Sequence, residues 1–152
     1  MARGARGRAD AASSAAIAAL QSVLAAENAA VYGYGLAGAQ LSGGQLSNAR
    51  QDWTVHQMAS AALSAMITER GGTPGAAAVA YRPPFPVNGA GAAVSLAAIL
   101  EDGVVRAYLS LVALADQGLR TFGAQGMQAA AIRAASWRGS TTAFPGLPAG
   151  DL

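Results

Sequence analysis

Apolar residues recur every three or four positions along four stretches of this chain, and this spacing predicts four amphipathic helices. The stretches cover approximately residues 13–40, 47–70, 88–116 and 119–138. Gly71-Gly72 and Gly139 follow two of them and are typical helix stops. The chain has 40 alanines among 152 residues, so its helices are expected to approach one another closely. The sequence therefore predicts an all-α fold.

The links between these helices predict how they are connected. Residues 41–44 and 117–118 are short links, which make antiparallel neighbours. The link at 72–87 is longer and contains four prolines, which favour an extended backbone that spans roughly 45 Å. Such a link runs the length of the bundle and makes the second and third helices parallel. Short, long-crossover and short connections are the ferritin-like pattern, so we expect a ferritin-like four-helix bundle over residues 13–138.

Polar residues interrupt the apolar stripe of each predicted helix. They are Glu27, His56, Glu101 and Arg133, one on each helix. At about 1.5 Å per residue, all four lie roughly 13 to 19 Å from the same end of the bundle. Charged groups facing a core are costly unless they are paired or bind a metal. We therefore expect these four residues to form one buried polar network.

Two interpretations of this polar layer remain open. Glu27, His56 and Glu101 are two carboxylates and an imidazole, a set that binds a single Fe, Mn or Zn ion in some proteins. Alternatively, the guanidinium of Arg133 replaces the metal and bridges the carboxylates through its five donors. We favour the second interpretation and expect no cofactor.

Several segments resemble an actinobacterial, alanine-rich family of ferritin-like domains of unknown function. The resemblance rests on residues 25–35, 81–87 and 100–103, and on Trp137-Arg138 followed by residues 143–148. It covers nearly the whole chain after the N-terminal arm and implies a fold rather than an activity.

The chain departs from the di-iron pattern of ferritin-like proteins, which takes one Glu from each of two helices and Glu-x-x-His from each of the other two. Glu27 and Glu101 match the single carboxylates, and His56 matches one histidine. The two remaining glutamates are replaced by Trp53 and Ala130, and the second histidine by Arg133. Three of six ligands remain, so the sequence indicates a degenerate di-iron site.

Two further motifs have simpler explanations than catalysis. Residues 33–38 read Gly-Tyr-Gly-Leu-Ala-Gly and match a dinucleotide-binding fingerprint, but that motif follows a strand and opens a helix. Here the glycines come late in a helix, where close helix contact or a bend would explain them. Asp52 and His56, spaced i and i+4, suggest a base and its orienter, although the helix dipole also explains an acid in an early turn.

Composition limits the remaining possibilities. Only 12% of residues are charged, which fits either a face covered in an oligomer or a solvated, alanine-rich helix surface; we expect a homo-oligomer, with a dimer preferred. Arg3, Arg6 and Arg8 stand in an arm at residues 1–12 that we expect to be disordered, and we expect no nucleic acid partner. The longest uncharged runs, residues 28–49 and 83–100, are broken by Gly-Gly or by prolines, so we predict no membrane span. The stretch at 11–26 reads as helix rather than signal peptide, so we expect a cytoplasmic location.

The sequence therefore favours a non-catalytic bundle that dimerises or docks to a partner protein. Its weakly charged faces and the tail at residues 139–152, which contains Phe144 and Pro148 and is expected to pack on or near the bundle, would supply the contact. The alternative is a mononuclear metal-binding or redox protein that uses Glu27, His56 and Glu101. No nucleophile motif is visible, so enzymatic activity is not expected.

Overall fold

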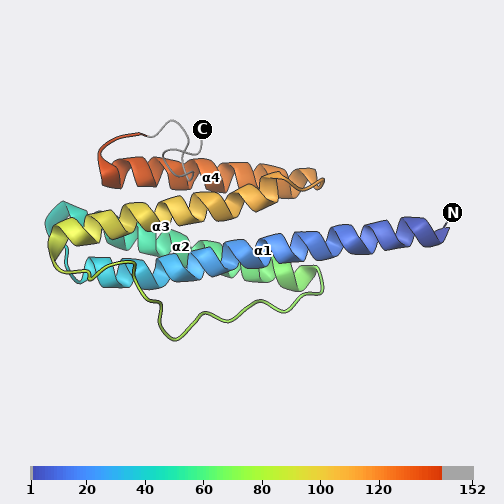
Figure 1. Ribbon diagram of the computed structural model, residues 1–152, viewed down its shortest axis with the longest axis horizontal. Coiled ribbons are helices and arrows are strands. Elements are labelled where there is room, and N and C mark those ends of the chain that lie inside the picture. The colour runs from blue at the N-terminus through green and yellow to red at the C-terminus, as the bar shows by residue number, and fades with distance from the viewer. Residues whose placement is uncertain (1, 142–152) are drawn as a thin grey trace.

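The computed structural model describes residues 2–141, and these residues form four α-helices and no strand. The helices are α1 (Ala2–Gly38), α2 (Gly43–Glu69), α3 (Gly89–Val112) and α4 (Gln117–Arg138). In Figure 1, α1 and α4 run in one direction and α2 and α3 in the other. The parallel arrangement of α2 and α3 that the link lengths predict is confirmed, with the long link joining them along the outside of the bundle.

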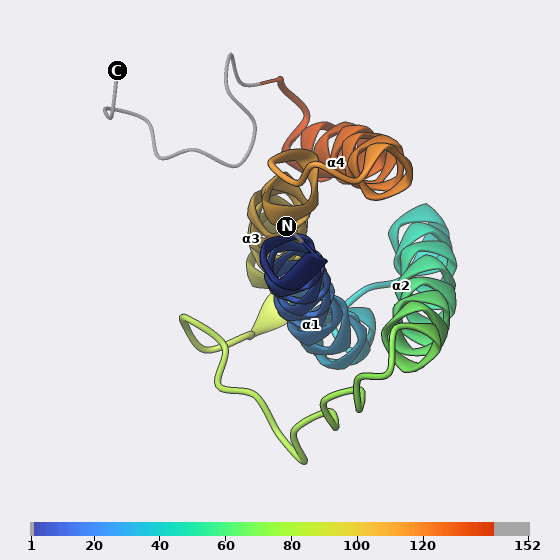
Figure 2. The same ribbon diagram turned by 90° about the vertical axis from the view of Figure 1, so that its right-hand side faces the viewer.

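The four helices do not pack equally. Helix α1 packs against both α2 and α3, and α3 also packs against α4, whereas α2 and α4 approach each other less closely. The end-on view in Figure 2 shows the four helices around a common centre in the order α1, α3, α4 and α2, with a wider gap between α4 and α2. Helices α1 and α3 therefore each pack closely against two neighbours, whereas α2 and α4 each pack closely against one.

The long link at residues 70–88 is attached to α1 by polar and aromatic contacts. The side-chain amide of Gln21 donates to the carbonyl of Thr73 over 2.6 Å and accepts from the amide of Gly75 over 2.8 Å. The rings of Tyr32 and Tyr81 lie 5.6 Å apart between centroids. These contacts hold the proline-containing segment along the bundle, as its composition predicts.

Small residues allow α3 and α4 to pack closely. A Cβ placed on Gly123 would lie 2.7 Å from Cβ of Leu111 and 3.2 Å from the carbonyl oxygen of Tyr108, which is closer than real Cβ atoms pack. The buried residues around this contact are mostly Ala, Leu and Val. The small-residue core expected from the alanine content is therefore present.

Helix α1 begins earlier than the sequence predicts. It starts at Ala2 rather than near Ser13, so residues 2–12, expected to be a disordered arm, continue the helix. The side chains described between residues 4 and 15 are exposed, and α1 extends beyond the other helices in Figure 1. Alanine has the highest intrinsic helix propensity, which explains a helix here without tertiary packing. The predicted C-terminal tail falls largely on residues 142–152, which lie outside the described residues.

The three-and-four spacing of apolar residues places Trp53 and Ala129 on the core-facing stripes of the second and fourth helices, but both are exposed, and one helix boundary also differs from the prediction. Trp53 is 38% exposed, and Ala129 is also exposed, because both lie beside the buried stripe of their helix. Asp116, expected at the end of the third helix, is the N-cap of α4, where its carboxylate accepts from the amide of Leu119 over 3.0 Å.

One segment passes a length-and-composition test for crossing a membrane, although the sequence analysis predicts no span. This segment is Arg6–Gly38 of α1, and the core helix of a bundle passes the same test. From Ala16 onwards, α1 contributes buried residues to the core, and one of them is the carboxylate of Glu27. Core packing therefore accounts for the apolar character of this segment from Ala16 onwards, whereas the side chains described before Ala16 are exposed.

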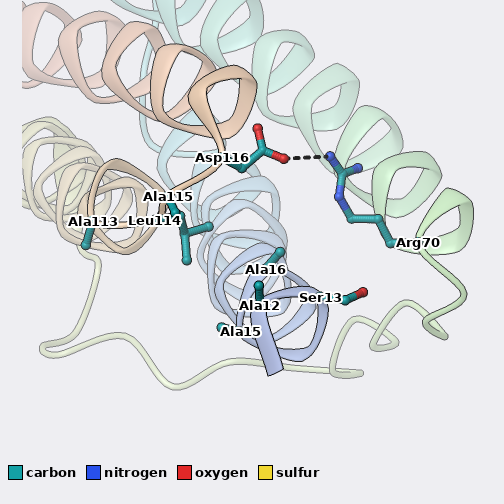
Figure 3. A pocket seen from close by; sticks show the side chains of 9 residues that line it. All are labelled: Ala12, Ser13, Ala15, Ala16, Arg70, Ala113, Leu114, Ala115 and Asp116. Atoms are coloured by element: carbon teal, nitrogen blue, oxygen red, sulfur yellow. Dashed lines mark ion pairs between the residues drawn. The ribbon is translucent and has the colours of Figure 1, made fainter. Parts of the chain in front are cut away.

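A hollow of about 490 Å³ lies at the end where α1 leaves the bundle. Alanines of α1 and of the α3–α4 link line it, and Figure 3 shows Arg70 and Asp116 at its edge. Their closest charged atoms are 3.9 Å apart. This ion pair connects the end of α2 to the start of α4.

Candidate functional site

The structure brings all four predicted polar residues into one layer of the core. Glu27 of α1, His56 of α2 and Glu101 of α3 are each at most 1% exposed. Arg133 reaches the layer from α4, with 17% of its side chain exposed. Each helix contributes one residue because the polar position interrupts the stripe that the helix buries.

His56 lies between the two carboxylates. Its Nδ1 is 2.5 Å from Oε2 of Glu27, and its Nε2 is 2.9 Å from Oε1 of Glu101. Carboxylates accept hydrogen bonds, so both ring nitrogens donate and the ring is an imidazolium. Burial alone would lower the pKa of His56, but the hydrogen bonds and charges of Glu101 and Glu27 outweigh it and raise this pKa to about 9. The histidine is therefore positively charged at neutral pH.

Arg133 supplies a second positive charge to the layer. Its Nε donates to Oε1 of Glu101 over 2.9 Å. Burial would raise the pKa of the Glu101 carboxyl, but His56 and Arg133 together lower it below its usual value. Two carboxylates and two cations thus balance, and the layer has no net charge.

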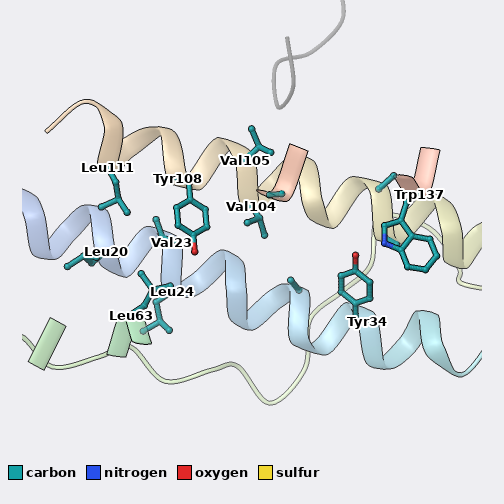
Figure 4. Packing of buried hydrophobic residues seen from close by; sticks show 14 of the residues in the cluster. Leu20, Val23, Leu24, Tyr34, Leu63, Val104, Val105, Tyr108, Leu111 and Trp137 are labelled. Atoms are coloured by element: carbon teal, nitrogen blue, oxygen red, sulfur yellow. The ribbon is translucent and has the colours of Figure 1, made fainter. Parts of the chain in front are cut away.

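Two tyrosines also donate hydrogen bonds to the carboxylates, in a reciprocal arrangement. Tyr34 of α1 donates to Glu101 of α3 over 2.7 Å, and Tyr108 of α3 donates to Glu27 of α1 over 2.9 Å. In Figure 4, the hydroxyl of Tyr34 points toward α3 and that of Tyr108 points toward α1. Each tyrosine lies seven residues after the glutamate of its own helix, and the helices are antiparallel, so each contacts the glutamate of the other.

Asp52 extends the network toward the surface. The indole Nε1 of Trp137 donates to its Oδ2 over 2.8 Å, and the hydroxyl of Tyr34 lies 3.3 Å from the same oxygen. Burial raises the pKa of the half-buried Asp52 carboxyl, partly offset by the hydrogen bond from Trp137. Asp52 does not hydrogen-bond to His56, so the base–orienter pairing suggested by their spacing is not formed. Instead, Asp52 and Trp137 connect α2 to α4.

Sequence reasoning missed three members of the network. The apolar spacing puts Tyr34 and Tyr108 on the core-facing stripes of their helices but gives no partner for their hydroxyls, and Trp137 stands out in the sequence only through the family resemblance. The i, i+7 spacing of Glu27 with Tyr34 and of Glu101 with Tyr108 is the signal that would have found the tyrosines. Nothing in the local sequence indicates that Trp137 contacts Asp52.

As arranged, Glu27, His56 and Glu101 do not fit a metal ion. The carboxylates of Glu27 and Glu101 lie at opposite edges of the His56 ring. A single ion could therefore bind both carboxylates only if they moved from these positions. Both oxygens of Glu27 already accept hydrogen bonds, and Arg133 sits on Glu101. Oε2 of Glu101 is buried without a hydrogen-bond partner and is the one such carboxylate oxygen in residues 2–141. Across these residues, no group of three or more acidic or histidine side chains has an arrangement that could hold a metal.

The comparisons with known proteins agree with the helical architecture. A family model described as a domain of unknown function (DUF4439) matches residues 19–149. The chain belongs to this family. The crystal structure of a conserved hypothetical protein, rv2844, from Mycobacterium tuberculosis is similar to it, with a TM-score of 0.79 and 29% sequence identity. The match covers 82% of this chain and 96% of that one. None of the curated proteins compared with the chain matches it significantly.

Membership of the DUF4439 family supports the expectation of a helical domain whose family has no assigned activity.

Proposed function

We propose that this chain is a non-catalytic bundle of ferritin-like topology whose degenerate di-iron layer is held by His56 and Arg133 in place of metal ions. In this proposal the protein acts through its outer faces, as a dimer or by docking to a partner protein. The connection pattern of the four helices supports the topology, since α2 and α3 are parallel and joined by the long link.

One observation carries the proposal: both ring nitrogens of His56 are engaged by carboxylates. A metal-binding imidazole needs a free lone pair on one nitrogen, whereas an imidazolium has none. His56 and Arg133 provide the two positive charges that the buried Glu27 and Glu101 require. Such a layer stabilises helix register and leaves no open coordination position at which chemistry would occur.

The outer faces of the bundle support a role in association. Met58 on α2 and Ile132 on α4 are 68% and 63% exposed, and Val55 lies on the same face of α2 as Met58 with 38% exposed. Large apolar side chains in such positions contribute to protein interfaces when a partner covers them. The low content of charged side chains reduces the desolvation cost of that contact.

The decisive experiment is metal analysis of the full chain, purified without chelator and then reconstituted separately with Fe(II), Mn(II) and Zn(II). The proposal predicts less than stoichiometric metal and no rise in melting temperature on loading, since an ion that binds only the folded state would raise it. Glu101→Gln is the matched control: it removes one carboxylate of the layer without changing its size, so metal retained by both proteins is bound elsewhere.

The alternative function is a mononuclear metal-binding or redox protein centred on Glu27, His56 and Glu101. The unpartnered buried oxygen of Glu101 favours it, because that atom is available to an ion. One tightly bound ion per chain that Glu101→Gln abolishes would establish this alternative and refute the metal-free proposal. Light scattering after gel filtration then tests association, and a monomer at all concentrations would exclude the dimer.

A further inference from the structure

A surface hollow beside the α1–α2 turn is lined by Gly35, Arg50 and Trp53, three residues whose presence there the packing of the fold does not explain. It has a volume of about 320 Å³ and lies between the last turns of α1 and the first turns of α2. Gly35 and Gly38 form its wall on α1, Arg50 and Trp53 form its wall on α2, and Tyr34 also lines it. This volume is near the lower limit of small-molecule pockets, which are about 300–1,000 Å³.

The glycines of this segment differ in what they do. A side chain on Gly33 would collide with Leu100, so close packing of α1 on α3 explains that glycine. A Cβ on Gly35 would meet no atom within 4 Å. Glycine inside a helix costs about 1 kcal/mol relative to alanine, and packing does not require it at position 35. Its effect is to keep the hollow open.

The wall on α2 presents an aromatic ring and a cation without partners. Trp53 is 38% exposed, although tryptophan buries a large apolar surface when a protein encloses it. Arg50 is exposed, and within residues 2–141 its guanidinium forms no hydrogen bond or ion pair. The two residues are spaced i and i+3, which places them on one side of α2 facing the same hollow.

We propose that this hollow is a binding site for a small planar aromatic monocarboxylate. The ring of the ligand would stack on Trp53 and pass over the bare backbone at Gly35, while its carboxylate pairs with Arg50. Guanidinium and carboxylate form paired, charge-assisted hydrogen bonds, and one cation matches one negative charge. The inference goes beyond the proposed function and does not depend on it, because the hollow is separate from the His56 carboxylate contacts.

Tyr34 connects this hollow to the buried polar layer. Its side chain lines the hollow, and its hydroxyl donates to Glu101 and approaches Asp52. A ligand seated against Tyr34 therefore lies one residue away from the buried charge layer.

The test uses naphthalene-2-carboxylate as the probe and naphthalene-2-carboxamide as its neutral match. The chain has two tryptophans, so ¹H–¹⁵N spectra contain two indole N–H signals, which Trp53→Phe assigns. We expect saturable movement of the Trp53 signal by the carboxylate and about tenfold weaker binding of the amide, the loss expected for one charge-assisted hydrogen-bonded pair.

Three variants make the result specific. Gly35→Leu fills the hollow at a position where the fold has room, so it should remove binding while the protein stays folded. Arg50→Gln should remove the preference for the carboxylate over the amide. Gly91→Leu, at another open helical glycine far along the chain, should bind the probe as the parent does.

Several results would overturn the proposal. They are an unmoved Trp53 signal, equal affinity for carboxylate and amide, and probe binding that survives Gly35→Leu. A Trp53 signal that moves with protein concentration alone would also overturn it, because the hollow would then belong to an interface between copies of the chain.

Discussion

Arg133 donates its Nε hydrogen to Oε1 of Glu101 over 2.9 Å, and this single oxygen also accepts from His56 and Tyr34. The other oxygen of the same buried carboxylate has no partner. The three donors to this oxygen come from α1, α2 and α4, and the oxygen itself belongs to α3. Glu101 is therefore the point at which all four helices are connected.

Removal of the Arg133 guanidinium is expected to destabilise the protein by about 3 kcal/mol, the lower part of the range for breaking a buried ion pair. The side chain is partly exposed, and His56 continues to neutralise Glu101, which limits the loss. Urea denaturation of Arg133→Ala measures it. Arg120→Ala, an exposed arginine of the same helix, is the control and should change stability by less than about 0.5 kcal/mol.

A double variant separates lost charge pairing from lost packing. Arg133→Ala with Glu101→Gln should recover part of the stability that Arg133→Ala loses, because the remaining group is neutral and hydrogen-bonds without a counter-charge. A double variant as unstable as the sum of the two single variants would show that the two residues do not act as a pair.

The pKa of His56 predicts how stability depends on pH. It is raised from 6.5 to about 9 in the folded state, so between these values the folded chain keeps a proton that the unfolded chain releases. Stability from this proton is fully present below pH 6.5 and is lost as pH rises through 9, by roughly 1.4 kcal/mol per unit at most. Denaturation curves at pH 6, 7, 8 and 9 test the slope.

The chain contains one histidine, which makes the assignment direct. Nitrogen chemical shifts of the His56 ring should report an imidazolium at pH 7.5, and His56→Gln should remove most of the slope between pH 6.5 and 9. A neutral ring at pH 7.5 would contradict the arrangement in which both nitrogens donate.

The reciprocal tyrosines predict a loss specific to hydroxyl groups. Tyr108→Phe keeps the ring packed near Phe122, with centroids now 5.9 Å apart, but leaves Oε1 of Glu27 without a donor. The expected cost is about 1–3 kcal/mol for an unsatisfied buried acceptor. Tyr32→Phe is the matched control. The ring of Tyr32 contacts Tyr81, and its hydroxyl forms no hydrogen bond within the described residues. Equal stability of Tyr108→Phe and the parent protein would show that the hydroxyl adds nothing.

The apolar spacing predicts much of the fold and the four residues of the polar layer. Glu27, His56 and Glu101 could be found because a polar residue on an apolar stripe is visible in the sequence itself. The contact of Trp137 with Asp52 could not be found, because it joins two helices whose relative position local spacing does not give. Residues 2–12 were mispredicted for a different reason: glycine and arginine suggested disorder, while the alanines between them favour helix.

Glycine positions provide a last prediction, in which one substitution has opposite effects at two sites. Gly123→Ala should destabilise the protein by about 1–3 kcal/mol, because the new Cβ would press on Cβ of Leu111 and on the backbone of α3, which cannot yield without moving the helix. Gly35→Ala should stabilise it by up to about 1 kcal/mol, because the site is open and alanine favours helix. Thermal unfolding of the two variants beside the parent checks both signs. If Gly123→Ala were neutral, α3 and α4 could not pack as closely as the structure shows. If Gly35→Ala were destabilising, the hollow at the α1–α2 turn would already be filled in solution.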